Sequence, residues 1–552
     1  MPDHSASSLR FLLPGLALIL SAFFAWFLIE DASREAPPEE SALTPSSSPV
    51  AIPLASPKQS GRAATCSPLT REDLLSVPNE RLIRFQTQDA YSRALELLAA
   101  HDLQNLGQLE DLLTLRVGYR DLSVLEDLFG EEELFHNFYH RTPPLPEGGV
   151  QPGAVPFGNT ALSFLGVTGD RRNYGKGVRV AALDSGITPH LTFGENLLPQ
   201  INLIPSPDPA LQNQHGTTIA GILGGQDPRL PGASPAAEIL PIRIIDERGL
   251  TNDWLILEGI SAARDNGADV LLMSFGGEGY NPVLADELLQ LHQDGVAIFA
   301  PTGNQGTNQV LYPAGYEGVY GVGAIDAGGN RLDFSAYGPG TDLVAPGLSL
   351  QAPYGEDLVT ATSGTSISVY AAAGVFVAEN SLQENETMVQ TTERHLRTAN
   401  DVGRPGYDSE TGAGVPHLDR ALRQDGPPVE DLALSSHFVV PPGDETSPPG
   451  VYVNIQNRGT TEVVNATITS KQDQTTTDFV VNSLAPNETA AFLLPLGQDR
   501  INDPAGLSIL TSISSQNPKQ DVDPQNNLRQ DQVVLPASAL PDSDVSSRKG
   551  RR

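Results

Sequence analysis

The stretch that decides the fold is Arg179-Val180-Ala181-Ala182-Leu183-Asp184-Ser185-Gly186. Its apolar run has the length of a buried strand and ends in a carboxylate and a Ser-Gly turn. Similar apolar runs recur downstream with helical stretches between them, a pattern that predicts βαβ units around a largely parallel sheet. Ligands bind beyond the carboxyl ends of such strands, so we expect Asp184 at a functional edge.

The α/β region is expected to span residues 153–424. Its candidate strands are Val178–Leu183, Glu238–Ile244, Val270–Met273, Val296–Ala300, Tyr320–Ala324 and Asp342–Ala345. Helical periodicity lies between them at Trp254–Asn266 and Val283–Gln293.

Three further polar residues stand where strands end or helices begin. His215 opens the small-residue stretch His-Gly-Thr-Thr-Ile-Ala-Gly of residues 215–221, and Asn304 follows the candidate strand Val296–Ala300. Ser366 stands just before an Ala-rich apolar run, where backbone amides and the helix dipole would stabilise negative charge. Each of the four residues alone has a structural explanation: Asp184 as a turn carboxylate, His215 as a core histidine, Asn304 as a turn residue and Ser366 as an N-cap. Together they supply an acid, an imidazole, an amide and a hydroxyl to one layer of the fold.

The order Asp, His, Ser along the chain is that of subtilisin. Asp184-Ser185-Gly186, the stretch 215–221 and Gly364-Thr365-Ser366 resemble the three signatures of the subtilisin-like serine proteases. Further stretches that fit the family lie at residues 273–277, 312–314, 321–326, 334–338, 345–347 and 412–414. The resemblance implies an α/β, three-layer, subtilisin-like domain that acts as a serine endopeptidase on polypeptides.

Catalytic roles follow from the resemblance and from chemistry. Ser366 would be the nucleophile, His215 its base, and Asp184 the group that orients the imidazole. Asn304 and the Ser366 backbone N–H would hold the oxyanion. The resemblance also implies a substrate groove, whose lining residues would be Ser274, Phe275, Gly276, Gly249, Leu250, Thr251, Pro301, Thr302 and Gly303.

Two departures from the family pattern bear on the site. Where the family has Met-Ala-x-Pro after the serine, this chain has Ile367-Ser368-Val369-Tyr370. Pro301-Thr302 replaces the usual Ala-Ala, which predicts a narrower or more polar specificity pocket. The loop 225–232 is short where many members bind calcium, so no metal ligands are assigned and no cofactor is required for the chemistry.

Residues 78–141 show a β-α-β-(β)-α-β pattern that predicts a ferredoxin-like α+β unit. It resembles the inhibitory propeptide of these proteases, which implies binding in cis. Its end, Leu134–Tyr139, is expected in the active-site groove. The Pro/Gly-rich residues 142–152 form a processing linker, with cleavage expected between Tyr139 and Gly153.

The remaining segments complete the domain plan. Residues 32–77 are a Pro/Ser-rich linker and 538–552 a disordered tail. Residues 430–537 predict an all-β sandwich, Ig-like or of the adhesion type found on secreted bacterial proteins. Its candidate strands are Val451–Gln456, Thr461–Ser470, Ala490–Leu496, Ser508–Ser514 and Gln532–Leu535. Deletion of this module is expected to leave hydrolysis largely intact.

Composition restricts partners and location. The formal charge of −33 disfavours nucleic acid, and Cys66, the sole cysteine, permits neither an intrachain disulfide nor a cysteine-based metal site. Phe11–Ile29 carries no charge, and residues 1–31 therefore predict a signal peptide or an uncleaved signal anchor. We expect an exported, extracytoplasmic bacterial protein, either secreted or held at the membrane by that segment.

An active, self-processed zymogen has two alternatives: an inactive scaffold and an esterase. A catalytically weak or inactive scaffold with an adhesive C-terminal module would be favoured by loss of a catalytic group, yet all four groups are present. An esterase would require a Gly-x-Ser-x-Gly elbow, whereas Ser366 lies in Gly-Thr-Ser-Ile-Ser.

Overall fold

The computed structural model describes residues 70–533 apart from 102, 131–132, 145–149, 206–213, 384–385, 425, 441–446, 473–474, 496–506 and 515–520. The segments predicted as signal or anchor (1–31) and tail (538–552) lie outside the described residues, as does most of the linker 32–77. Within the described part of the chain, no helix is both long and apolar enough to cross a bilayer.

A seven-stranded sheet forms the centre of the α/β domain, with every neighbouring pair parallel. Its strands, in spatial order, are β13 (Leu343–Pro346), β12 (Val319–Ile325), β11 (Ala297–Pro301), β10 (Val270–Met273), β6 (Arg179–Asp184), β8 (Glu238–Arg243) and β7 (Ile201–Asn202). The predicted parallel sheet is therefore confirmed: the bounds of the predicted strands differ from the observed ones by at most one residue, and only the two-residue β7 was missed.

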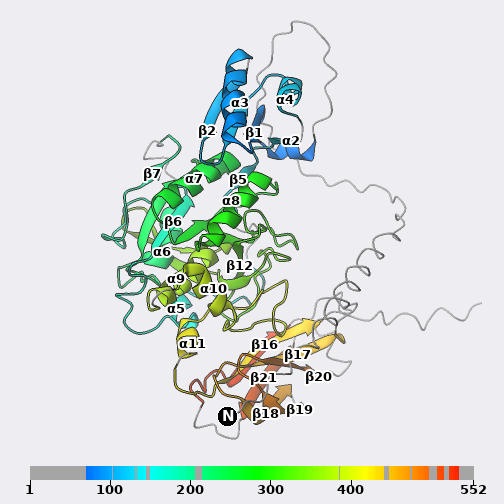
Figure 1. Cartoon of the computed structure of the whole chain (residues 1–552). Helices are drawn as coiled ribbons and strands as arrows, with labels where there is room; N and C mark the ends of the chain where they lie inside the picture. The colour runs from blue at the N-terminus through cyan, green and yellow to red at the C-terminus, as the bar shows by residue number, and fades with distance from the viewer. Residues whose placement is uncertain are drawn as a thin grey trace, which may run out of the picture. The chain divides into compact units, whose positions relative to one another are not determined.

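Helices cover both faces of this sheet (Figure 1). One face holds α6 (His215–Gly224), α9 (Thr365–Asn380) and α10 (Met388–Leu396), and the other holds α7 (Asp253–Asp265) and α8 (Pro282–Gln293). Strand side chains alternate between the two cores: Val180 and Ala182 face α6 and α9, whereas Ala181 and Leu183 face α7 and α8. Because the strands are buried on both faces of the sheet, their sequences are continuous apolar runs.

Shorter elements complete the domain. They are α5 (Ala161–Phe164), β9 (Leu250–Asn252), the hairpin of β14 (Leu350–Tyr354) and β15 (Leu358–Thr362), and α11 (Leu418–Arg423). The sequence pattern did not predict the hairpin, in which β14 is partly buried and β15 is mostly exposed.

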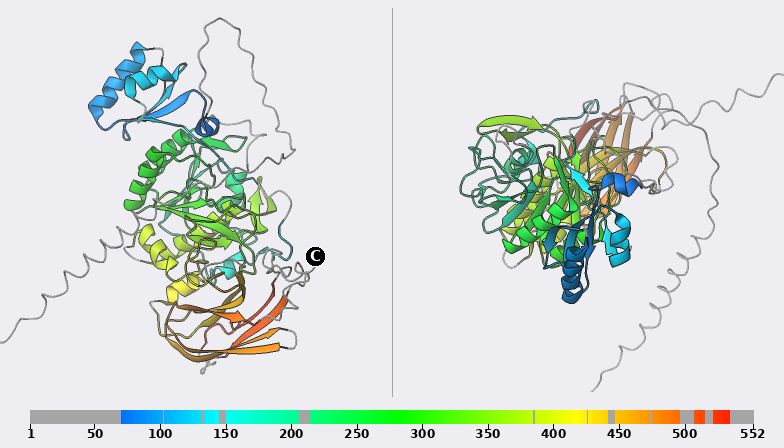
Figure 2. Two further views of the ribbon diagram at one scale, coloured as in Figure 1. Left: turned by 90° about the vertical axis from the view of Figure 1, so that its right-hand side faces the viewer. Right: turned by 90° about the horizontal axis from the view of Figure 1, so that it is seen from above.

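The N-terminal unit is an antiparallel sheet of order β2-β3-β1-β4 with α3 and α4 on one face (blue in Figure 2). Its elements run β1 (Glu80–Arg84), α3 (Gln88–Ala100), β2 (Gln104–Leu109), β3 (Thr114–Gly118), α4 (Leu122–Phe129) and β4 (Leu134–Phe135). This confirms the predicted ferredoxin-like order. A short helix, α2 (Arg71–Leu75), precedes it inside the range expected to be a linker, stabilised by a capping box of Thr70 and Asp73.

The C-terminal region is a sandwich of a three-stranded and a four-stranded antiparallel sheet (orange and red in Figure 2). The first holds β16 (Leu432–Val440), β17 (Gly450–Asn457) and β20 (Thr489–Leu494); the second holds β19 (Thr475–Leu484), β18 (Val463–Gln472), β21 (Leu507–Ser514) and β22 (Leu528–Val533). The predicted sandwich is confirmed, but β16 and β19 were missed. β19 is a largely exposed edge strand, and β16 carries polar residues that are buried by contacts the sequence does not show.

Candidate active site

Asp184 and His215 form a hydrogen-bonded pair at the carboxyl edge of the central sheet. β6 ends at Asp184 and α6 begins at His215, whose Nδ1 lies 2.9 and 3.0 Å from the two carboxylate oxygens. Because a carboxylate only accepts, Nδ1 carries the proton, and Nε2 is the ring nitrogen that does not face Asp184. The carboxylate is buried, whereas the imidazole remains partly exposed. At Gly216 a Cβ would lie 2.4 Å from the Gly186 carbonyl oxygen, so a residue without a side chain permits this close approach.

Ser366 lies in the first turn of α9, after Gly364, whose φ of +135° favours glycine. Its hydroxyl donates to the carbonyl oxygen of Ser274 at 3.5 Å, a long and weak contact. Ser274 follows β10, and Met273 of β10 pairs with Leu183, the neighbour of Asp184. α9 also packs on α6, the helix that begins with His215. Strand pairing and helix packing thus bring the three predicted residues to one edge of the sheet.

Asn304 follows β11, and hydrogen bonds to its side-chain oxygen fix the orientation of its amide group. Its Oδ1 accepts from the backbone N–H and from the hydroxyl of Thr365, both at 2.9 Å. The amide nitrogen donates to the carbonyl oxygen of Pro144 at 3.0 Å. The predicted oxyanion donor thus contacts a peptide carbonyl in the linker after the N-terminal unit.

The segment after β4 lies between the two predicted walls of the groove. Strand β5 (Tyr139–Arg141) pairs antiparallel with β9, and Thr142 N–H donates to the Gly249 carbonyl at 3.0 Å. On the opposite side, Arg141 and Gly276 exchange two backbone hydrogen bonds of 3.0 and 2.8 Å.

The expectation that Leu134–Tyr139 fills the groove was wrong for Leu134 and Phe135, which pair with β1 inside the N-terminal sheet. The end of the segment meets the catalytic domain beside the groove, where Phe138 forms hydrogen bonds with Asp253 and Tyr139 pairs with Asn252. In the sequence, residues 134–139 form one strand-like run. Its division between the N-terminal sheet and the pair of β5 with β9 depends on pairing with strands that are distant in the sequence.

The other predicted lining residues are placed beside this groove. Pro301 ends β11, Thr302 is fully buried, and Gly303 has a φ of +117°. The Thr302 hydroxyl has no hydrogen-bond partner among the described residues. Phe275 is fully buried, and its ring meets that of His140 edge to face at 6.0 Å between centroids.

Tyr370 stands where the family pattern places proline. Its side chain is buried beneath the site, and burial together with the nearby Asp184 carboxylate raises the pKa of its hydroxyl well above the ordinary range. The phenol therefore stays neutral. In the preceding turn, the Ser368 hydroxyl lies 3.2 and 3.4 Å from the carbonyl oxygens of Pro346 and Gly364.

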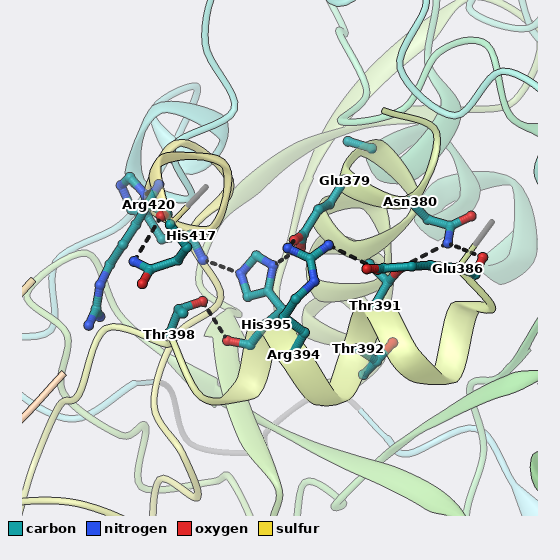
Figure 3. A network of polar contacts seen from close by, with 12 residues as sticks. Glu379, Asn380, Glu386, Thr391, Thr392, Arg394, His395, Thr398, His417 and Arg420 are labelled. Carbon is teal, nitrogen blue, oxygen red and sulfur yellow. Dashed lines mark hydrogen bonds and ion pairs between the residues drawn. The ribbon is translucent and has the colours of Figure 1, made fainter. Parts of the chain in front are cut away.

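A second acid–imidazole pair, Glu379 with His395, lies at the other end of α9 (Figure 3). Both side chains are fully buried, and Arg394 contacts the same carboxylate at 3.0 Å. Nε2 of His395 accepts the backbone N–H of His417 at 2.8 Å. With both ring nitrogens engaged and buried, this imidazole has no nitrogen left for a substrate, so the pair fixes α10 and α11 to α9.

No metal centre emerges from the described part of the chain. It holds no group of three or more His, Cys, Asp or Glu side chains arranged to bind a metal ion.

Comparison with known proteins was made against families, curated proteins and solved structures. A family model described as the subtilase family matches residues 175–414. The chain is 30% identical over 279 residues to a thermostable alkaline protease of Halalkalibacterium halodurans, covering 49% of this chain and 74% of the relative. It is also 30% identical over 253 residues to subtilisin Savinase of Lederbergia lenta, covering 45% of this chain and 92% of the relative.

Among solved structures, the fold is similar to that of fervidolysin from Fervidobacterium pennivorans, a keratinolytic enzyme related to subtilisin. The TM-score is 0.53 at 20% identity, over 79% of this chain and 71% of that chain. At this identity the likeness concerns the fold alone.

Proposed function

The chain belongs to the subtilase family of serine peptidases, and from this premise we propose that it is an active endopeptidase that forms an acyl-enzyme on Ser366. The observation that carries the proposal is the contact of His215 Nδ1 with both oxygens of the buried Asp184 carboxylate. A carboxylate in that position fixes the imidazole tautomer and stabilises the imidazolium formed during the reaction.

The proposed reaction uses the groups in sequence. Ser366 gives up its weak bond to Ser274, transfers its proton to His215 Nε2, and attacks the scissile carbonyl. His215 then returns the proton to the leaving amine. Asn304 Nδ2 and the Ser366 backbone N–H hold the tetrahedral oxyanion. Loss of one such donor reduces turnover by about 10²–10³, a figure established for subtilisin and not for this chain.

We further propose that residues 78–141 are an inhibitory propeptide that acts in cis. The support is the position of Tyr139–Thr142, hydrogen-bonded to both walls of the groove as an added strand. Because the Pro144 carbonyl meets the amide of Asn304, the peptide bond after Pro144 is the first candidate for self-cleavage. Export through residues 1–31, with secretion or membrane anchoring as its outcome, belongs to the same proposal.

An active-site probe tests the nucleophile. A fluorophosphonate should label the mature enzyme and its Ser368→Ala variant, and should fail on Ser366→Ala. Ser368 is a matched control because it is a hydroxyl in the same helical turn. Equal labelling of the wild type and Ser366→Ala would refute the assignment, and absence of labelling with no peptide hydrolysis would favour an inactive scaffold.

Processing is tested by the size and N-terminus of the purified protein. The wild type should lose its first 140–150 or so residues, whereas Ser366→Ala should remain full length. Sequencing the mature N-terminus distinguishes cleavage after Pro144 from cleavage elsewhere between Tyr139 and Gly153. Identical processing of the two proteins would argue against self-maturation.

A further inference from the structure

A buried contact joins the propeptide-like segment to the catalytic domain beside the groove. His140 of β5 places Nε2 2.7 Å from Oδ1 of Asp253, a residue 113 positions later in the chain. Both side chains are fully shielded from solvent. Tyr139 and Arg141, the flanking residues of the strand, are exposed, so His140 is the side chain that this strand presents to the enzyme.

The side chain of His140 lies in a pocket of definite shape. The ring of Phe275 meets the imidazole edge to face, and Thr251 is its partner in the strand register. Gly277 forms another wall: a Cβ there would lie 2.8 Å from His140 Nδ1 and 2.6 Å from the Tyr139 carbonyl oxygen. A side chain at position 277 would therefore fill the space that the imidazole occupies.

Asp253 is the first residue of α7, and its carboxylate accepts three hydrogen bonds. Oδ2 accepts from the Phe138 backbone N–H and from Asn281 Nδ2, both at 2.8 Å, while Oδ1 accepts from His140. Two of these donors belong to the segment that leaves with the propeptide. A substrate strand in the same position supplies the backbone N–H that donates to Oδ2, whatever its sequence. The donor to Oδ1 is a side chain, so only a substrate with a suitable side chain at that position supplies it. An apolar occupant leaves that charged oxygen buried and unpaired, which is costly.

We propose that Asp253 makes this subsite selective for histidine, so that the preferred substrates are polypeptides with histidine at the strand position that His140 occupies. This rests on the proposed function, because it concerns the same groove. Histidine fits better than lysine or arginine because the pocket offers one acceptor oxygen to one ring N–H. An ammonium or a guanidinium brings three or five N–H groups, and most of them would be buried without partners.

The test uses mature wild-type enzyme and internally quenched peptides with the sequence of residues 136–148. The peptides differ only at position 140, which is His or Phe. Phenylalanine is the matched control because it keeps a flat ring and removes the donor to Oδ1. We expect kcat/KM to be at least tenfold higher for the His peptide, since a hydrogen bond to a charged group is typically worth about that much or more. Equal or faster cleavage of the Phe peptide would overturn the proposal.

The enzyme side of the pair provides a second test. Asp253→Asn keeps the shape of the side chain and removes its charge, and we expect the His-to-Phe ratio of kcat/KM to fall by at least threefold. An unchanged ratio would overturn the assignment of Asp253. If this variant fails to mature, the peptide comparison on the wild type decides alone.

The outcomes separate this inference from the function on which it rests. Cleavage of both peptides at equal rates leaves an active peptidase and overturns only the selectivity for histidine. Absence of cleavage of these peptides and of an unrelated protein substrate such as casein would overturn the proposed function, and this inference with it.

Discussion

The catalytic domain contacts its N-terminal and C-terminal neighbours in different ways. On the N-terminal side, backbone hydrogen bonds from Tyr139–Thr142 and exposed ion pairs such as Arg84 with Asp286 accompany a buried side-chain pair, His140 with Asp253. Leu82 of the N-terminal unit also packs into the apolar core around α7 and α8. On the C-terminal side, the contacts are made by buried side chains. Arg420 donates to Asn487 Oδ1 of the sandwich at 2.7 Å, and within its own domain it donates to Ala399 O at 2.6 Å.

The sandwich also meets the loop around Asp401 through polar side chains. Gln456 Oε1 accepts the Asp401 backbone N–H at 3.0 Å, and Asn454 Nδ2 donates to the carboxylate at 3.2 Å. Both amide side chains are buried. Such contacts leave unpaired polar groups on both sides when the domains part.

The strand in the groove is the part of the N-terminal contact that another polypeptide can replace. Any polypeptide offers backbone N–H and C=O groups, so a strand in the groove is exchangeable for another. Buried side-chain contacts depend on particular partners. That deletion of residues 430–537 leaves hydrolysis largely intact stays a prediction: none of their described residues contacts the strand in the groove, but their removal exposes polar groups that the sandwich now satisfies.

The largest effect is expected from Arg420→Ala at the sandwich contact. Three acceptors, Ala399 O, Asn400 Oδ1 and Asn487 Oδ1, lose a donor at once, so we expect a loss of roughly 3–5 kcal/mol in the free energy of unfolding. Thermal or urea unfolding measures it. Arg172→Ala, which removes an exposed arginine, should show no resolvable change. A small effect at Arg420 would contradict the view of this contact as permanent.

Asp401 makes the same contact sensitive to pH. Burial raises its pKa from 3.8 to about 7, and its Oδ1 has no partner among the described residues. Since the folded protein binds this proton more tightly than the unfolded chain, the stabilisation is complete below about pH 4 and is lost as pH rises through 7. The difference is at most ~4 kcal/mol.

Asp401→Asn tests this dependence. The variant should gain melting temperature relative to wild type between pH 5 and pH 8, because asparagine does not ionise. A difference between the two proteins that is the same at both pH values would exclude Asp401 as the titrating group.

A moderate effect is expected from removing one backbone donor in the groove. In a peptide of residues 136–144, Arg141→Pro deletes the N–H that donates to Gly276, so inhibition of the mature enzyme should weaken about tenfold. Arg141→Ala keeps that donor and should inhibit nearly as well as the native peptide. Equal losses in the two peptides would assign the binding to the arginine side chain and weaken the comparison drawn above.

The smallest effect is expected from Arg84→Ala. Its ion pair with Asp286 is exposed, and such pairs contribute about 1 kcal/mol or less. Urea unfolding of the full-length Ser366→Ala chain measures it, with Asp286→Ala as the reciprocal variant. A loss as large as that of Arg420→Ala would mean that surface charge, and not the strand in the groove, holds the propeptide.

Much of the site could be predicted because its residues stand at local landmarks. Asp184 ends an apolar run, and His215 and Ser366 begin small-residue helices, so the sequence alone indicates their positions. The pairing of His140 with Asp253 has no such signal. Neither residue lies in a motif, and only the pairing of β5 with β9 brings them together.

The amino-acid sequence by itself indicated the α/β layer and the two flanking folds, because hydrophobic periodicity and turn chemistry act over a few neighbouring residues, and its resemblance to a known family indicated the candidate catalytic residues. The tertiary structure alone decided where the strand Leu134–Tyr139 divides, which side chain enters the pocket at Asp253, and how firmly the sandwich is held. Those features depend on burial and hydrogen bonding between segments that lie far apart in the sequence. The energy of each such contact depends on the partner residue, which the local sequence does not specify.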